Sequence, residues 1–412
     1  MKRKIILFLI LSLAIFKIDQ AVELKSNIST SFYSYQSRDL NTEEKTSYFR
    51  AYQSFRFDLN QIGTKNLSFH TYFRSTTDFL HKNSTDPSTK IYNAYLDWKN
   101  IKKILDLRLG RQYLYVGVGN GTMDGLRVDV KPIEKIKLTG YVGFQLPRER
   151  STDIDTWEKS HIFGGELATT YLKDTRLAVS YVQKVRDKWI EEQFIGLNAS
   201  HYHKKFDFFS QFYYNLVYRK AQNFTLRGTG SELFGNLYVA LEYQYRRPSI
   251  YSNSIFSVFK QEPYSLYRFT GTYQPIKNFR FTSEYDFTKY KKDTSSRTSF
   301  GVEYSFIALG LNFRRGYGGE SNGVYGKIIY TFNKNFVFSV STDYGRYKLD
   351  EEQESKDESF AVTSRVEWEP LKNLQLAMEM QDVRNKVKNY DLRLQGKASY
   401  KFGLSFKGKK RE

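Results

Sequence analysis

Apolar and polar residues alternate strictly along most of this chain, and this alternation limits the fold more than any other feature. In the segment SYFRAYQSFRFDLN, for example, Phe49, Phe55 and Phe57 share one parity, and Arg50 and Arg56 share the other. A period of two places one set of side chains on each face of a β-strand. The same pattern returns in KIKLTGYVGFQL and near the C-terminus, whereas windows with the helical period of 3.6 are scarce. The sequence therefore predicts an all-β fold built from two-faced strands.

Composition excludes several classes of protein. No stretch after the N-terminal segment has about 18 consecutive apolar residues, as a membrane-spanning helix requires. Aromatic residues make up 17% of the chain, with 33 Tyr and 33 Phe, which argues against disorder. The absence of Cys excludes disulfides, thiol catalysis and Cys-ligated zinc. A formal net charge of +20 favours anionic partners.

The N-terminus has the organisation of a secretory signal. Lys2, Arg3 and Lys4 form a basic start, residues 5–16 form an apolar run, and a short polar stretch ends near Ala21. This order of a basic, an apolar and a cleavage region is typical of a signal peptide that is removed on export. An exported basic protein does not meet cytoplasmic nucleic acid, so we expect no nucleic-acid partner.

Two kinds of β protein alternate in this way, a soluble sheet protein and an outer-membrane barrel. In this chain the apolar parity is rich in Phe, Tyr and Gly, and the strand-like segments have about 10 to 14 residues, the length of a strand tilted across a bilayer. The sequence therefore predicts a transmembrane antiparallel β-barrel in the bacterial outer membrane, in contact with lipid and lipopolysaccharide. The expected parts are a signal peptide at 1–21 and a single barrel domain at 22–412.

Short turns with similar flanks recur along the chain and give an estimate of the strand number. Ten are recognisable: WKNIKKIL, KPIEKIKL, QPIKNFRF, TFNKNFVF, EPLKNLQL, QIGTKNLSF, YLKDTRL, YHKKFDF, ELFGNLYV and YSFIALGL. Each joins two strands by about two to five residues, while longer polar loops lie between them, as in outer-membrane barrels. Ten such turns predict about 22 strands. A count of about 18 stays open, because the segments around 224–227 and 309–315 are short. A barrel of about 22 strands without a preceding plug domain implies loops that fold inward.

One segment, LRLGRQYLYVGVGNGTMDGLRVDV at 107–130, carries a Gly-Arg-Gln step at 110–112 and an Asp-Gly-Leu-Arg step at 124–127. This strand, loop and strand resembles a pattern found in Gram-negative porins, and especially in the alginate-export family of outer-membrane β-barrels. The resemblance implies a barrel channel without a cofactor. It also implies that four residues lie at or near the pore wall: Arg111, Gln112, Asp124 and Arg127.

The polar parity of the strands supplies the remaining candidates for a channel wall. With the four residues of the resemblance, the predicted pore-lining set is Arg108, Arg111, Gln112, Asp124, Arg127, Arg246, Arg268, Arg280, Arg314, Arg365 and Arg393. Carboxylates such as Asp97, Asp286 and Glu379 share the same parity. Pairing along the wall is therefore the competing interpretation, because unpaired like charges on adjacent strands are destabilising. A modest excess of basic groups predicts a mild preference for anions.

These features favour an outer-membrane channel, a porin, for passive diffusion of small hydrophilic, anionic solutes. A narrower version is an alginate-like polysaccharide export channel. The alternative from another class is a barrel enzyme of the outer-membrane phospholipase type, which needs an outward constellation of Ser, His and Asn or Asp. Its candidates, His70, His81 and His161, lie in no recognisable motif. A structural sheath around a partner and a homo-oligomer also stay open, and no metal or other cofactor is expected.

The loop at 247–263 is unusually apolar and is the predicted pore constriction. It contains Ile250, Tyr251, Phe256 and Phe259. Exposed apolar residues in such number need burial, either against the inner wall beside the flanking arginines or against a neighbouring subunit.

Overall fold

The computed structural model describes residues 22–38, 44–82, 86–146, 153–248, 262–349, 355–386 and 391–406. All regular secondary structure among these residues is β-strand. The strands are β1 (Val22–Arg38), β2 (Lys45–Asn60), β3 (Leu67–Asp78), β4 (Ser88–Ile101), β5 (Leu105–Val116), β6 (Gly119–Ile133), β7 (Ile136–Gln145), β8 (Ser160–Thr169), β9 (Thr175–Arg186), β10 (Trp189–His203), β11 (Phe206–Asn215), β12 (Lys220–Leu233), β13 (Leu237–Arg246), β14 (Tyr264–Ile276), β15 (Phe279–Lys289), β16 (Thr294–Tyr304), β17 (Ile307–Gly316), β18 (Glu320–Asn333), β19 (Phe336–Lys348), β20 (Asp357–Leu371), β21 (Leu374–Asn385) and β22 (Asp391–Phe406).

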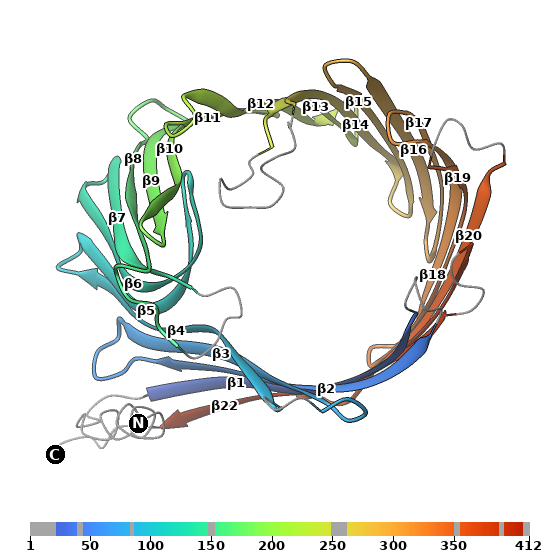
Figure 1. Cartoon of the computed structure of the whole chain (residues 1–412), viewed down its shortest axis with the longest axis horizontal. Helices are drawn as coiled ribbons and strands as arrows, with labels where there is room; N and C mark the ends of the chain where they lie inside the picture. The colour runs from blue at the N-terminus through green and yellow to red at the C-terminus, as the bar shows by residue number, and fades with distance from the viewer. Residues whose placement is uncertain are drawn as a thin grey trace.

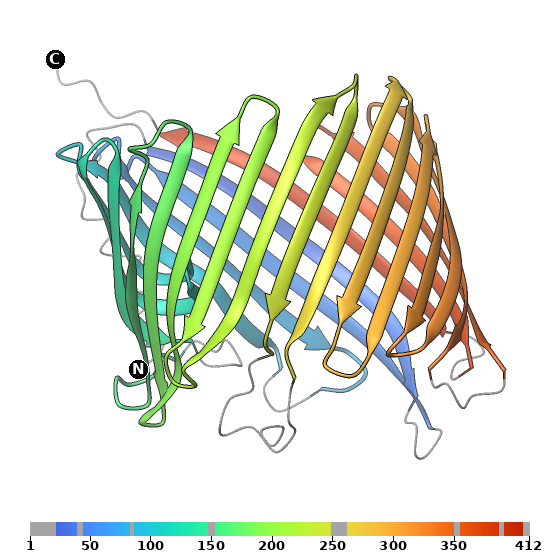
Figure 2. The same cartoon turned by 90° about the horizontal axis from the view of Figure 1, so that it is seen from above.

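Each strand pairs antiparallel with the next one along the chain, and the last strand pairs with the first. The closing register joins Val22 to Phe406 and Ser34 to Leu394. The result is one closed 22-stranded sheet, drawn as a ring in Figure 1, with strands tilted to the barrel axis in Figure 2. Closure leaves no strand edge unpaired, which a membrane-spanning sheet requires.

The strand number agrees with the higher of the two sequence estimates. All ten short turns lie between consecutive strands, from β2–β3 to β20–β21. The two segments that left a count of 18 open belong to complete strands, β12 and β17. Within the described residues, no helix is long and apolar enough to cross a membrane.

The two rims of the barrel differ. The ten short turns lie at the rim where β1 begins and β22 ends, and one of them, between β6 and β7, consists only of residues 134–135. The strand ends that longer connections join, such as those of β7 and β8 and of β19 and β20, lie at the opposite rim, at the bottom of Figure 2. This rim also has short turns, such as residues 187–188 between β9 and β10. Most of the predicted constriction loop, residues 249–261, lies outside the described residues.

The outward parity of the wall is apolar and exposed. Leu241, Phe269, Phe300 and Leu309 are examples of large hydrophobic side chains that remain accessible on this face. In water such a surface would be costly, at roughly 25 cal/mol per Å² of apolar area. A belt of this kind is the lipid-facing surface of a transmembrane barrel.

The hairpin formed by β5 and β6 leaves the wall and bends into the barrel. Figure 1 shows β5 and β6 curving inside the ring next to β7, β8 and β9. Accordingly, β6 contacts β8 and β9, although neither is its neighbour in the sheet. The main buried apolar cluster of the described residues forms where the hairpin meets the wall.

Candidate functional site

The strand register identifies the interior face of the wall. The amide of Val118, in the inward hairpin, donates to Ser180 Oγ at 3.1 Å, so Ser180 points inward. Directly paired residues in an antiparallel sheet point to the same side, and so do alternate residues along one strand. Pairs run from Ser180 to Gly196, to Tyr213, and on around the ring. This places eight of the predicted arginines on the interior face: Arg108, Arg127, Arg246, Arg268, Arg280, Arg314, Arg365 and Arg393.

Two paired glycines allow the hairpin to bend. Gly110 pairs with Gly125 across β5 and β6. Gly110 has a φ of +121°, a conformation that side chains disfavour, and a Cβ there would overlap the carbonyl oxygen of Ala94. A Cβ on Gly125 would likewise overlap the carbonyl oxygen of Val142. The backbones therefore approach closely where the hairpin leaves the wall.

A buried ion pair and a buried amide stabilise this bend. Arg111 Nε lies 2.7 Å from Asp124 Oδ1, and Arg111 Nη2 lies 2.8 Å from Asp124 Oδ2, a bidentate pair. Gln112 Nε2 donates to the carbonyl oxygens of Gly125 and Arg108 at 3.0 and 3.2 Å. Arg111 is 6% exposed, Asp124 8% and Gln112 0%.

These contacts correct the expectation that Arg111, Gln112 and Asp124 line the pore. They are buried because the hairpin turns inward at this point and packs against the wall. They support the hairpin and are almost fully buried, so they offer little surface to a solute. Arg127 remains on the interior wall, where Arg127 Nη2 lies 3.0 Å from Asp129 Oδ2.

The hairpin tip docks through apolar side chains. Its contribution consists of Leu114, Val116, Val118 and Met123, and the wall contributes Tyr141, Ile162 and Val182. Glycines bring the two surfaces together, because a Cβ on Gly117 would overlap Ser180 and one on Gly196 would overlap Val118. On the opposite side of the hairpin Tyr115 is 80% exposed.

The sequence contains a signal for this docking. Leu114 and Val116 follow Arg108 on the parity that is polar elsewhere in the wall. Apolar residues on the polar parity need a covering surface inside the barrel, and the inner wall of β7–β9 provides it.

Most of the interior arginines are paired with carboxylates. Arg268 Nε lies 2.7 Å from Asp286 Oδ1, and the pair is bidentate. Comparable pairs join Arg108 to Asp97 at 3.0 Å, Arg280 to Glu303 at 2.6 Å, Arg365 to Glu367 at 2.7 Å and Arg393 to Asp391 at 2.8 Å. Wall pairing therefore neutralises much of this charge.

A different arrangement lies on the inner wall of β22, β1, β2 and β3. Arg56 lies over the ring of Tyr72, with its guanidinium carbon 5.2 Å from the ring centroid. Arg74 lies over Tyr52 at 5.2 Å and over Tyr92 at 5.4 Å. Cation–π contacts orient a guanidinium without neutralising its charge.

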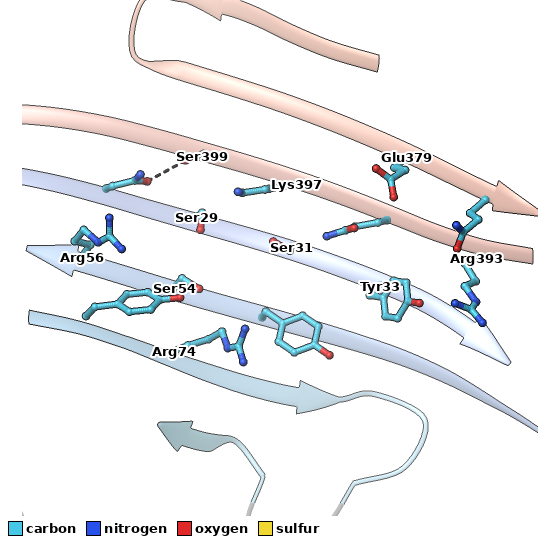
Figure 3. A pocket seen from close by; sticks show the side chains of 15 residues that line it. Ser29, Ser31, Tyr33, Ser54, Arg56, Arg74, Glu379, Arg393, Lys397 and Ser399 are labelled. Carbon is cyan, nitrogen blue, oxygen red and sulfur yellow. Dashed lines mark hydrogen bonds between the residues drawn. The ribbon is translucent and has the colours of Figure 1, made fainter. Parts of the chain in front are cut away.

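We call Arg56, Arg74 and Lys397 the cation track. None of the three forms a salt bridge with another described residue. They line one concave region of about 530 Å³, together with Arg393, one carboxylate, Glu379, and the hydroxyls of Ser29, Ser31, Ser54 and Ser399. Figure 3 shows these side chains arising from neighbouring strands. Basic side chains outnumber the one carboxylate in this lining, and hydroxyl groups complete it, which suits a hydrophilic anion.

The described residues contain no group of three or more His, Asp or Glu side chains that could hold a metal ion. Of the three histidines considered for an enzyme, His161 stacks on Trp157 at 4.3 Å between ring centroids, and His81 lies 4.0 Å from Asp78. His70 has a serine and a carboxylate as neighbours.

Comparisons with known proteins give similarity in fold. No protein-family model and no curated protein sequence matches the chain. Similar solved structures include OccAB3 of Acinetobacter baumannii, with a TM-score of 0.46, 10% identity, and coverage of 92% of this chain and 99% of that one. OpdQ of Pseudomonas aeruginosa has a TM-score of 0.46, 12% identity, and coverage of 92% and 99%. A BenF-like porin from Pseudomonas fluorescens Pf-5 has a TM-score of 0.42, 11% identity, and coverage of 93% and 99%.

Structural similarity at such low sequence identity assigns no solute to the chain. The class of protein follows instead from the architecture of the barrel. A closed antiparallel barrel with an apolar outer belt, a polar interior face, short turns at one rim and longer loops at the other is an outer-membrane β-barrel of Gram-negative type.

Proposed function

We propose that this protein is an outer-membrane porin for passive diffusion of small hydrophilic, anionic solutes. The observation that carries the proposal is the cation track, formed by Arg56, Arg74 and Lys397 on a polar interior wall. Charged side chains that line a pore set its ion selectivity, and Arg and Lys favour anions. Because tyrosine faces orient the two arginines, their charge remains available to a passing solute.

The inward hairpin complements the track. Its tip occupies part of the interior beside β7–β9, whereas the track lies on β22 and β1–β3. A solute that passes the barrel therefore meets a narrowed interior with one strongly cationic wall. The predicted pore-lining arginines Arg246 and Arg314 lie on the same interior face and add to the positive field.

Several further assignments belong to this proposal. Residues 1–21 are the signal peptide and 22–412 the mature barrel domain. The short-turn rim faces the periplasm, and the longer loops contact lipopolysaccharide at the cell surface. Self-association into a homo-oligomer is compatible with a porin.

An alginate-like export channel is the narrower candidate. The Gly-Arg-Gln and Asp-Gly-Leu-Arg steps at 110–112 and 124–127 support it. Against it stands the absence, in the loop YVGVGNGTM, of the arginine that this family pattern often carries between the two steps. The burial of Arg111 and Asp124 also removes two charged groups from contact with a polysaccharide.

The proposal predicts that neutralising the cation track lowers anion selectivity. In the double variant Arg56→Gln/Arg74→Gln, we expect the permeability ratio of chloride over potassium, measured from reversal potentials in a low-salt gradient, to fall about twofold. The variant Arg56→Lys/Arg74→Lys keeps both charges and should retain the wild-type ratio. Equal reversal potentials for the Gln variant and the wild type would show that the track does not set selectivity.

A further inference from the structure

Three polar side chains near the short-turn rim form a relay on the interior face. Asp58 lies near the end of β2, and Ser68 and His70 lie at the start of β3. His70 Nδ1 lies 2.5 Å from Asp58 Oδ1, and His70 Nε2 lies 2.9 Å from Ser68 Oγ. Asp58 pairs directly with His70, and Ser68 is two residues from His70, so the three share one face.

The atoms of this relay are connected in the order that nucleophilic catalysis requires. A serine hydroxyl needs a base on its proton, and the imidazole needs a carboxylate at its other nitrogen to fix its tautomer and stabilise its charged form. Here His70 Nε2 faces the hydroxyl, and His70 Nδ1 faces the carboxylate. The side chains of His70 and Asp58 are 23% and 33% exposed, so the relay is accessible from the interior.

We propose that Ser68, His70 and Asp58 form a hydrolytic site for small, water-soluble carboxylic esters. The site faces the barrel interior, so it does not fit the outward constellation expected of an outer-membrane phospholipase. A lipid held in the bilayer cannot reach it, whereas a soluble ester can. The inference goes beyond the proposed porin function and uses it only for access of the substrate.

The reaction follows from the geometry. Ser68 Oγ attacks the ester carbonyl carbon and transfers its proton to His70 Nε2. The bond between the carbonyl carbon and the alcohol oxygen then breaks, and His70 returns the proton to the leaving alcohol. A water molecule next gives a proton to His70 and attacks the acyl carbon. The bond between the acyl carbon and Ser68 Oγ then breaks, and His70 returns its proton to Oγ. This step releases the carboxylic acid and restores the Ser68 hydroxyl, and no oxidant or reductant is needed.

A positive group lies close to this relay in the sheet. Ser68 pairs with Asp97, and Asp97 pairs with Arg108 on the next strand. Arg108 Nη2 lies 3.0 Å from Asp97 Oδ2, while Arg108 Nε is buried without a hydrogen-bond partner among the described residues. Arg108 is therefore bound by Asp97, like the other paired arginines of the wall, and the relay itself consists of Ser68, His70 and Asp58.

The competing interpretation is a structural hydrogen-bond network. Ser68 Oγ also lies 3.3 Å from the carbonyl oxygen of Asp97 and can donate its proton there. In that arrangement the serine is not activated. Covalent labelling distinguishes a nucleophilic serine from a serine that only joins strands.

The experiment uses the full-length mature barrel, refolded in detergent, with a fluorophosphonate probe and p-nitrophenyl acetate as substrate. We expect a covalent adduct on the peptide that contains Ser68, and hydrolysis that falls by about a hundredfold or more in both Ser68→Ala and His70→Asn. Ser341→Ala is the matched control, because Ser341 lies on the interior face of β19, far from any of these groups in the sheet, and should leave both readouts unchanged.

Single-channel conductance of the same preparation separates this inference from the porin proposal. Ser68→Ala should conduct like the wild type. A conducting wild-type barrel that is not labelled, or labelling that persists in Ser68→Ala, overturns the hydrolytic site and leaves the channel intact. A labelled barrel that does not conduct overturns the channel and leaves the hydrolytic site.

Discussion

Replacing Arg111 by methionine is expected to release the β5–β6 hairpin tip from the inner wall. The side chain of Asp124 is buried and bound by Arg111 in two charge-assisted contacts of 2.7 and 2.8 Å. Removing one partner of a buried ion pair leaves an uncompensated charge and costs about 3–5 kcal/mol. We expect the amides of residues 112–123 to lose most of their protection in hydrogen exchange, and single-channel conductance to rise as the interior widens.

The double variant Arg111→Met/Asp124→Leu is the matched control for this prediction. Replacing both members of a buried ion pair by apolar residues of similar volume is often close to neutral. The double variant should therefore recover most of the exchange protection that the single variant loses. If Arg111→Met exchanges like the wild type, the bidentate pair does not stabilise the docked hairpin.

Placing leucine at Gly196 is expected to displace the same tip from the other side of the contact. Gly196 lies on the interior face of β10, where an added Cβ would overlap Val118 and lie 2.8 Å from Ser180 Oγ. Close-packed interiors do not absorb an extra side chain without movement. We expect the hairpin tip to move rather than the closed wall. Single-channel conductance should then rise about twofold or more, because the displaced apolar cluster no longer narrows the interior.

Gly345→Leu is the control for a leucine added to the interior face. Gly345 pairs with Gly323 on β18–β19, and its nearest neighbours, Asn322 O and Ser359 Oγ, would lie 3.7 Å from an added Cβ. This substitution should leave the hairpin docked. Heat-modifiable migration in electrophoresis should persist in both variants, because the barrel remains closed. Similar conductance of Gly196→Leu and the wild type would show that the docked tip does not limit ion flow.

The barrel could be predicted from the sequence because its signals are local. The parity of Phe49, Phe55 and Phe57 against Arg50 and Arg56 defines a two-faced strand without any knowledge of neighbouring strands. The short turns are similarly local, since each depends on a few residues between two apolar strand ends. Alternation and turns together determine strand number, antiparallel order and the difference between the rims.

The interior could be predicted only in part because its chemistry depends on register. The sequence placed Arg268 and Arg365 on the polar parity, but only the pairing of strands shows that each meets a carboxylate. Arg56 and Arg74 differ from them because tyrosine rings lie beside them, and these tyrosines lie on neighbouring strands.

The sequence alone does not predict the inward β5–β6 hairpin, for a related reason. The hairpin bends at Gly110 and Gly125, so the residues after the bend no longer lie on the barrel wall. Arg111 and Asp124 are therefore buried, although the alternation of the sequence does not predict their burial. The apolar run of Leu114 and Val116 on the polar parity was the available signal. The relay of Asp58, Ser68 and His70 also needed the register, because Asp58 is twelve residues from His70 along the chain.

The most direct test of the porin proposal is the current carried by the wild-type protein in a planar lipid bilayer under a salt gradient. Discrete conductance steps of stable size, with a reversal potential on the anion-selective side that weakens as rising salt screens the wall charges, are the predicted result. Absence of steps from a correctly folded barrel, or clear cation selectivity at low salt, would contradict the proposal that this barrel is an anion-preferring channel.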